Sequence, residues 1–250
     1  GTAVPMQLNE ETGYNADIDN LRSLITPRTK LLIINSPNNP CGSVIPETDL
    51  EKIAEMAVEN DLIVLTDEIY KDMYYGDQEH VSITKFPGMR ERSVILDGFS
   101  KSYAMTGWRL GYGVFPKFLV EPVTRLVTNS VSCTSVFSQM AAIAALQGPQ
   151  GSVTAMMEEF TKRRDLIVRG LNSLPGITCP IPQGAFYAFP NIRASGMTSK
   201  EFADRALNEA GVALLAGTAF GAFGDGYIRV SFANSQENLR EAVDRLRSIL

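Results

Sequence analysis

The chain has 250 residues, of which 44% are hydrophobic and 20% are charged, and its formal net charge is −5 at pH 7. This composition is typical of a folded globular protein and excludes a disordered tail. The acidic balance, with 28 Asp and Glu against 23 Lys and Arg, argues against a nucleic-acid partner. No apolar stretch approaches the roughly 18 residues that span a membrane, and no signal-peptide pattern opens the chain, so we expect a cytoplasmic protein without a membrane partner.

Three cysteines and one histidine limit the chemistry that the chain can offer. The cysteines are widely separated and form no Cys-x-x-Cys pair, which argues against a disulfide framework and against a zinc site. A single histidine, His80, argues against histidine-based metal sites and against a Ser-His triad. We therefore expect no metal, and we interpret His80 as a surface or structural residue.

Strands and helices alternate in the first part of the chain. Short apolar runs predict strands at residues 30–34, 62–65, 93–96 and 110–115. Strands separated by helices form parallel βαβ units, and continuous apolar runs are typical of strands that are covered on both faces. The last of these strands has no crossover helix before it, so we expect it to be antiparallel to its predecessor. The pattern predicts an α/β fold with a three-layer, mostly parallel sheet.

Helical periodicity fills the segments between these strands. Asp17 is the expected N-cap of a short helix, and Pro46 is expected in the first turn of a second helix that stops at Asn60. The predicted apolar face of the second helix comprises Leu50, Ile53, Ala54, Ala57 and Val58. A further helix is predicted after Ser135, and we expect it to pack tightly through Phe137, Met140, Ala141, Ala144 and Ala145.

The pattern changes after a long amphipathic stretch at residues 153–174. Strands are predicted at residues 185–189 and 227–232. A capping box formed by Thr198 and Glu201 predicts a helix at residues 202–210, and Ser235 is expected to cap a final helix. We therefore expect a large domain at residues 1–151 and a smaller α+β domain at residues 152–250.

Polar side chains follow the three strands that are expected to be parallel. Ligands bind beyond the carboxyl ends of such strands, and the residues found there are Asn39, Asp67, Tyr70, Ser100, Lys101 and Arg109. Each one alone has a structural explanation, such as a turn, a helix cap or a solvated charge. Together they offer an amine that can bond an aldehyde, a carboxylate that can pair with a pyridine nitrogen, hydrogen-bonding groups for a ring oxygen, and a guanidinium for a phosphate. These are the requirements of pyridoxal 5′-phosphate (PLP).

Three segments also carry a family resemblance. They are N-S-P-N-N-P-C-G at residues 35–42, D-E-I-Y at residues 67–70 and S-K-S-Y-A-M-T-G-W-R-L-G-Y at residues 100–112. They resemble the class I/II aminotransferases of PLP fold type I, closest to the aspartate and aromatic subgroup, and the resemblance covers essentially the whole chain. It implies a homodimeric, PLP-dependent enzyme that transfers an amino group from an amino acid to a 2-oxo acid by a ping-pong mechanism.

The resemblance assigns cofactor roles residue by residue. It implies that Lys101 is the catalytic lysine, which binds the cofactor covalently and moves a proton between the substrate α-carbon and the cofactor C4′ atom. It implies that Asp67 faces the pyridine nitrogen and keeps it protonated. Tyr70 and Asn39 are implied to hydrogen-bond the ring 3′ oxygen.

The resemblance also assigns the anion-binding residues. Arg109, with Ser100 as a helper, is implied to hold the cofactor phosphate. The segment at residues 227–232 resembles the family segment whose arginine binds the substrate α-carboxylate, so Arg229, together with Asn39, is the expected substrate anchor.

Two alternatives share much of this sequence evidence. One is a PLP-dependent C–S β-lyase on the same fold, because the lysine, aspartate and arginine roles are common to both. The other is a non-catalytic, aminotransferase-like regulatory domain. Because family members carry further N-terminal residues before the point that matches Gly1, we also expect this chain to be N-terminally incomplete, with an unpaired edge on its sheet.

Overall fold

The computed structural model describes residues 1–76 and 79–250, and these residues form two compact units. Unit 1 consists of Gly1–Leu8, Asn15–Pro37 and Val44–Thr154. Unit 2 consists of Asn9–Tyr14, Asn38–Ser43 and Ala155–Leu250. Two short segments from the first part of the sequence therefore belong to the unit built by the last part, and the predicted boundary between residues 151 and 152 stays a prediction.

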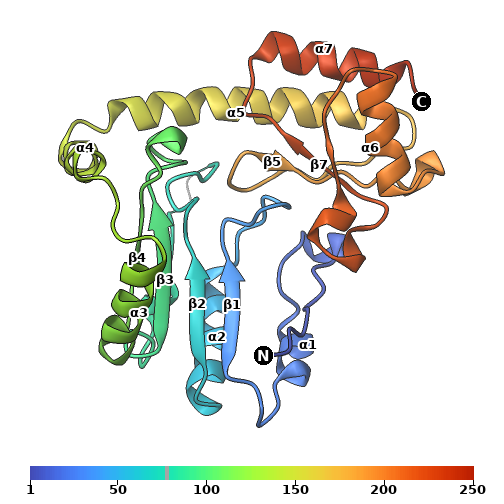
Figure 1. The fold of residues 1–250 in the computed structure, drawn as a ribbon. Helices are drawn as coiled ribbons and strands as arrows, with labels where there is room; N and C mark the ends of the chain where they lie inside the picture. The colour runs from blue at the N-terminus through green and yellow to red at the C-terminus, as the bar shows by residue number, and fades with distance from the viewer. Residues whose placement is uncertain (77–78) are drawn as a thin grey trace. The chain divides into compact units, whose positions relative to one another are not determined.

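Unit 1 is organised around a four-stranded sheet with the order β1-β2-β3-β4 (Figure 1). The strands are β1 (Leu31–Asn35), β2 (Ile63–Asp67), β3 (Ser93–Gly98) and β4 (Gly111–Val114). The first three run parallel and β4 runs antiparallel to β3, as the sequence predicts. The α/β fold class is confirmed, but β1 is not covered on both faces as expected, because Leu31 and Ile33 are 48% and 64% exposed. No strand pairs with the outer side of β1 among the residues that the structure describes, so β1 forms an edge of the sheet.

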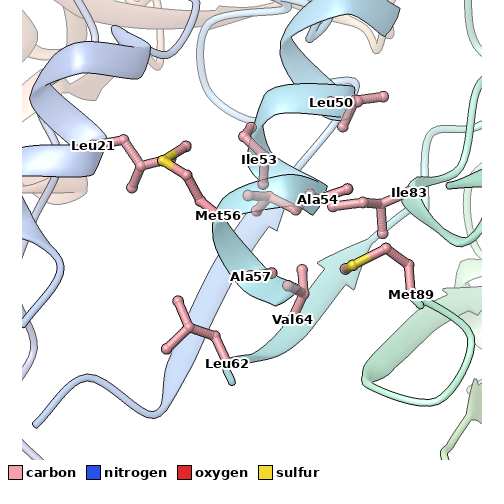
Figure 2. Packing of buried hydrophobic residues seen from close by; sticks show 11 residues of the cluster. Leu21, Leu50, Ile53, Ala54, Met56, Ala57, Leu62, Val64, Ile83 and Met89 are labelled. Carbon is pink, nitrogen blue, oxygen red and sulfur yellow. The ribbon is translucent and has the colours of Figure 1, made fainter. Parts of the chain in front are cut away.

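One face of the sheet is covered by α2 (Glu47–Glu59), whose buried side chains point toward β1 and β2 (Figure 2). The predicted face is correct for Leu50, Ile53, Ala54 and Ala57, all of which are buried. It is wrong for Val58, which is 43% exposed, whereas Met56 is fully buried. The reason is tertiary: α1 (Ile18–Leu24), capped by Asp17 as predicted, places Leu21 against Met56 and so widens the buried face on that side.

The β3–β4 pair approaches closely because glycine stands on both strands. A Cβ atom on Gly98 would lie 3.0 Å from the Cα of Gly111 and 3.1 Å from the carbonyl oxygen of Leu110. Gly98 precedes the turn that contains Ser100 and Lys101. The strand pairing therefore fixes where this turn begins.

The second half of unit 1 contains α3 (Lys117–Ser130) and α4 (Val136–Gln147). The sequence patterns did not predict α3, which has Pro122 inside it and buries none of its residues. The prediction that α4 packs tightly through Phe137 and Met140 is wrong, because these side chains are 73% and 61% exposed. The helix contacts the rest of unit 1 through Ala142, which joins a small cluster with Phe99, Met105 and Leu110. The prediction is correct for Ala141 and Ala145, which pack against this cluster.

Unit 2 contains a small antiparallel sheet with the order β5-β7-β6. Its strands are β5 (Tyr187–Ala188), β6 (Leu215–Ala216) and β7 (Ile228–Ser231). Its helices are α5 (Gly151–Asn172), which begins at the end of unit 1, α6 (Ser199–Asn208) and α7 (Gln236–Arg247). The α+β character is confirmed, but the strand predicted at residues 185–189 is only two residues long.

The capping box predicted in unit 2 is present. Thr198 accepts a hydrogen bond from the backbone of Glu201, and Glu201 accepts one from the backbone of Thr198, so α6 begins three residues earlier than the predicted start at residue 202. Ser235 likewise caps α7. Across residues 1–76 and 79–250, no helix is both long enough and apolar enough to cross a membrane.

Candidate active site

The carboxyl ends of β1, β2 and β3 meet at one edge of the unit 1 sheet (Figure 1). Asn35 pairs with Asp67 in the strand register and donates a side-chain hydrogen bond to its carbonyl oxygen over 3.0 Å. Because side chains alternate along a strand, Asp67 lies on the face opposite to Val64 and Thr66, which are buried on the α2 side. The register therefore decides on which face the carboxylate stands.

Asp67 is a half-buried carboxylate in a polar turn. Its Oδ1 atom accepts a hydrogen bond from the backbone N–H of Ile69 over 3.1 Å. Burial raises the pKa of Asp67 above its usual value, and nearby Asp97 adds to the rise, whereas the hydrogen bond from Ile69 and the charge of Lys101 lower it. A carboxylate with a raised pKa regains its charge when a cation binds beside it. The site thus favours a cationic partner at this position.

Tyr70 and Lys101 accompany Asp67. Tyr70 is almost fully buried, and the Lys101 Nζ atom lies 5.6 Å from the centre of its ring. Lys101 stands in a turn after β3, in which its carbonyl oxygen accepts a hydrogen bond from Ala104 N–H and Phe99 O accepts one from Met105 N–H. The structure therefore brings three of the predicted cofactor residues together in unit 1, and Ser100 is half-buried next to the lysine.

Arg109 also belongs to unit 1 but has different surroundings. It is exposed, has a left-handed backbone with φ of 51°, and donates a hydrogen bond from Nη1 to the Thr106 carbonyl oxygen over 2.9 Å. It lines an open hollow of about 830 Å³ together with Trp108 and Ser135, among others, and Lys101 is not among the lining residues. Its predicted contact with a phosphate stays a prediction.

Asn39 and Arg229 are brought together in unit 2, although 190 positions separate them in the sequence. Arg229 lies on β7 and donates from Nη1 to the Asn39 Oδ1 atom over 3.0 Å. Its guanidinium carbon lies 4.5 Å from the centre of the Tyr187 ring and 5.0 Å from that of Phe220. Two aromatic rings and one amide thus orient the guanidinium.

The loop that carries Asn39 is fixed within unit 2 by backbone geometry. Gly42 has φ of 69°, and a Cβ atom on it would lie 2.6 Å from the Cβ of Pro182. Its carbonyl oxygen accepts hydrogen bonds from the N–H groups of Gln183 and Gly184. No residue larger than glycine fits there without displacement, so Gly42 helps to place Asn39.

The sequence patterns missed several groups near these residues. Asp97 is buried and binds both the Lys71 ammonium and the Tyr112 hydroxyl, and its Oδ1 accepts from Gly98 N–H over 2.6 Å. Burial lowers the pKa of Lys71, but its hydrogen bond and ion pair with Asp97 outweigh burial and raise it. Tyr187 and Phe220 were missed as well. No periodicity marks such residues, because they become neighbours only through strand pairing and loop closure.

Comparison with known proteins now identifies the family. The family model described as "Aminotransferase class I and II" matches residues 1–246. The chain belongs to the class I and II aminotransferases. This is the family whose segments the sequence resembles, and its members depend on PLP.

The similar aminotransferases include archaeal enzymes. The chain is 44% identical to an aspartate aminotransferase of Pyrococcus abyssi over 252 residues, which cover 100% of this chain and 64% of that relative. It is 42% identical to aromatic-amino-acid aminotransferase 2 of Thermococcus litoralis, again covering 100% of this chain and 64% of the relative. The crystal structure of an aromatic aminotransferase from Pyrococcus horikoshii superposes with a TM-score of 0.96 at 42% identity, covering 99% of this chain and 66% of that one. The chain thus spans about 64% of the length of the curated relatives that it matches.

The donor set of unit 1 fits the cofactor of this family. Asp67 offers a carboxylate whose raised pKa favours a cationic partner, which suits a protonated pyridine nitrogen. Tyr70 offers a phenol for the ring oxygen, and Lys101 offers an amine beside both. We therefore treat PLP as the group to which these side chains are suited.

Proposed function

We propose that the chain provides the catalytic lysine and most of the cofactor-binding and substrate-binding residues of a PLP-dependent aminotransferase. In this proposal it transfers an amino group from an amino acid to a 2-oxo acid in two half-reactions. The observation that carries the proposal is the gathering of Asp67, Tyr70 and Lys101 at the carboxyl ends of β2 and β3. Family membership supports it.

Each side chain performs a step that its chemistry allows. PLP, when bound, supplies an electron-withdrawing ring that stabilises negative charge on the substrate α-carbon. Lys101 Nζ would condense with the cofactor aldehyde with loss of water. Once the substrate amine has displaced it, the freed Lys101 amine would move a proton between the substrate α-carbon and the C4′ atom. Asp67 holds the pyridine nitrogen in its protonated form, and Tyr70 donates a hydrogen bond to the ring oxygen.

The anions are bound by guanidinium groups. Arg109, with Ser100 beside Lys101, binds the cofactor phosphate through charge-assisted hydrogen bonds. Arg229 binds the substrate α-carboxylate with the donors that Asn39 leaves available. Asn39 orients Arg229 and also donates its amide N–H to the ring oxygen. A homodimer, which the family resemblance implies, is part of the proposal.

The cofactor assignment is tested with the full chain and PLP. We expect a visible absorbance band, and we expect borohydride to fix the cofactor to the peptide that contains Lys101. The variant Lys101→Ala loses both, whereas the control Lys52→Ala, which changes a lysine on the exposed side of α2, keeps both. Identical spectra for the native chain and Lys101→Ala contradict the assignment.

The reaction is tested by product analysis with amino donors of the aspartate and aromatic classes, which the names of the relatives suggest. We expect a 2-oxo acid to form only when a 2-oxo acid acceptor is present. Release of pyruvate and ammonia without an acceptor would instead indicate the C–S β-lyase. Absence of cofactor binding together with ligand-dependent association with another protein would favour the regulatory domain.

A further inference from the structure

A buried carboxylate stands behind the candidate active site. Glu68 follows Asp67 directly and is 4% exposed. Its Oε1 atom accepts hydrogen bonds from Thr66 Oγ1 over 3.2 Å and from Ser82 Oγ over 2.8 Å, and its Oε2 atom lies 2.7 Å from His80 Nε2. Burying a carboxylate is costly unless its oxygens are hydrogen-bonded. The proposed reaction does not use Glu68.

The hydrogen bonds continue from Glu68 to the end of β1. His80 Nδ1 lies 3.0 Å from the Tyr74 hydroxyl, and Tyr74 forms a hydrogen bond with Ser36, which follows β1. Ser36 Oγ in turn accepts from Ile45 N–H over 3.0 Å. We call this set of side chains the Glu68 network; its members are Ser36, Thr66, Glu68, Tyr74, His80 and Ser82.

The network has a defined direction of hydrogen bonding. A carboxylate only accepts hydrogen bonds, so the His80 Nε2 atom carries a proton. Burial raises the pKa of Tyr74 to about 12, so the phenol keeps its proton at neutral pH and can donate it to Nδ1. His80 is thus held from both sides, by Glu68 at Nε2 and by Tyr74 at Nδ1.

Backbone hydrogen bonds also hold Glu68, one of them to strand β3. Glu68 N–H donates to Leu96 O on β3 over 2.9 Å, and Lys71 N–H donates to Glu68 O over 2.8 Å. In the sequence, Glu68 lies between Asp67 and Tyr70, the two proposed cofactor ligands. A side chain with three partners at this point restricts the turn that carries both of them.

We propose that the Glu68 network is a positioning device for the cofactor site. Glu68 and His80 are positioning residues that hold the turn of Asp67 and Tyr70 from the α2 side of the sheet. This inference rests on the proposed function for its consequence, because the turn is expected to hold PLP. The geometric part, restriction of the turn by the network, is independent of cofactor binding.

The test uses the full chain and separates these two parts. Hydrogen exchange of the cofactor-free protein is measured for Glu68→Leu, His80→Leu and the conservative Glu68→Gln. We expect amides at residues 67–73 to exchange about tenfold faster in the two Leu variants, while those of α2 keep their protection. Glu68→Gln keeps a side-chain oxygen acceptor and stays within about twofold of the native rates. The control Ile53→Val destabilises the α2 core and should not accelerate exchange selectively in this turn.

Two further readouts bear on the same variants. Because the chain has one histidine, nitrogen NMR of labelled histidine shows a single imidazole, which we expect as the Nε2–H form in the native chain and not in Glu68→Leu. The dissociation constant for PLP, measured by absorbance, is expected to rise about tenfold or more in both Leu variants and to be restored in Glu68→Gln.

The outcomes decide the inference separately from the function. Unchanged exchange at residues 67–73, or equal loss of protection in α2, overturns the positioning role. Local acceleration with an unchanged dissociation constant overturns it too, because the restricted turn would then not serve the cofactor. If the native chain binds no PLP, the proposed function fails, and the role of the Glu68 network in cofactor binding fails with it. Hydrogen exchange and the imidazole spectrum then still decide whether the network restricts the turn.

Discussion

Arg229 Nη1 donates a hydrogen bond to Asn39 Oδ1 over 3.0 Å, which joins β7 to a loop near the other end of the sequence within unit 2. We predict that Arg229→Lys raises the KM for the amino donor by about ten- to a hundredfold. Lysine cannot form the bidentate hydrogen bonds that arginine forms with a carboxylate. The lost hydrogen bond to a charged group contributes about 1.5–3 kcal/mol of binding free energy. Steady-state kinetics on the active protein measure the KM of both forms. The control Arg22→Lys, on α1, should leave KM unchanged, and an unchanged KM in Arg229→Lys contradicts the assigned role.

Asp67→Asn should stabilise the cofactor-free protein while abolishing cofactor binding. Burial raises the pKa of Asp67 above its usual 3.8. In the pH window between the pKa of the unfolded chain and the higher pKa of the folded state, the folded state therefore binds more protons than the unfolded chain. This contribution to stability therefore falls as pH rises through that window. Urea unfolding from about pH 3 to about pH 7 should show Asp67→Asn matching the native chain below the window and exceeding it above. If the free energy of unfolding of the native chain rises relative to that of Asp67→Asn as pH increases, the fold stabilises the charged carboxylate, and the prediction is contradicted.

Lys71→Met should destabilise unit 1 by about 3–5 kcal/mol, because it leaves the charge of Asp97 buried without its cation. The Asp97 side chain is only 3% exposed, so its carboxylate has little contact with water. The double variant Lys71→Met/Asp97→Asn should recover much of the loss, since no unpaired charge remains. Urea unfolding of the native chain, Lys71→Met, Asp97→Asn and the double variant measures the coupling. Simple addition of the two single effects would mean that the pair does not interact.

Ile53→Ala should lower the free energy of unfolding by about 2–5 kcal/mol, whereas Ile53→Val should cost about 0.5–1.5 kcal/mol. Ile53 is fully buried in the core between α2 and the sheet (Figure 2). Val58→Ala, on the same helix, is the matched control, and its exposed side chain should cost no more than about 0.5 kcal/mol. Chemical denaturation provides the comparison. A larger loss for Val58→Ala than for Ile53→Ala would contradict the observed burial.

Cys133 should react first with iodoacetamide at neutral pH. It is exposed, whereas burial raises the pKa of Cys41 and of Cys179 to about 12, which keeps both thiols protonated and unreactive. Mass spectrometry of the labelled peptides should give one fast and two slow sites. In urea all three should react at similar rates. Fast labelling of Cys179 in the folded protein would contradict its burial.

The local elements of this chain are largely encoded in its local sequence. Asp17, Thr198 and Ser235 mark the starts of three helices because each side chain accepts backbone N–H groups of the first turn. The apolar runs predict the three parallel strands, and the missing crossover helix predicts that β4 is antiparallel. The errors occur where burial depends on distant residues. Leu21 determines that Met56 is buried, and no pattern within residues 117–147 shows which apolar side chains of α3 and α4 remain exposed.

The sequence alone determined the residue types of the candidate site, because an amine, a carboxylate, a phenol and guanidinium groups at strand ends suit one kind of cofactor. Only the tertiary structure decided how they are held. The β1–β2 register sets the face of Asp67, ring contacts orient Arg229, and the Glu68 network lies behind the turn. Such contacts join residues that are far apart in the chain, so they depend on strand register and packing rather than on local propensity.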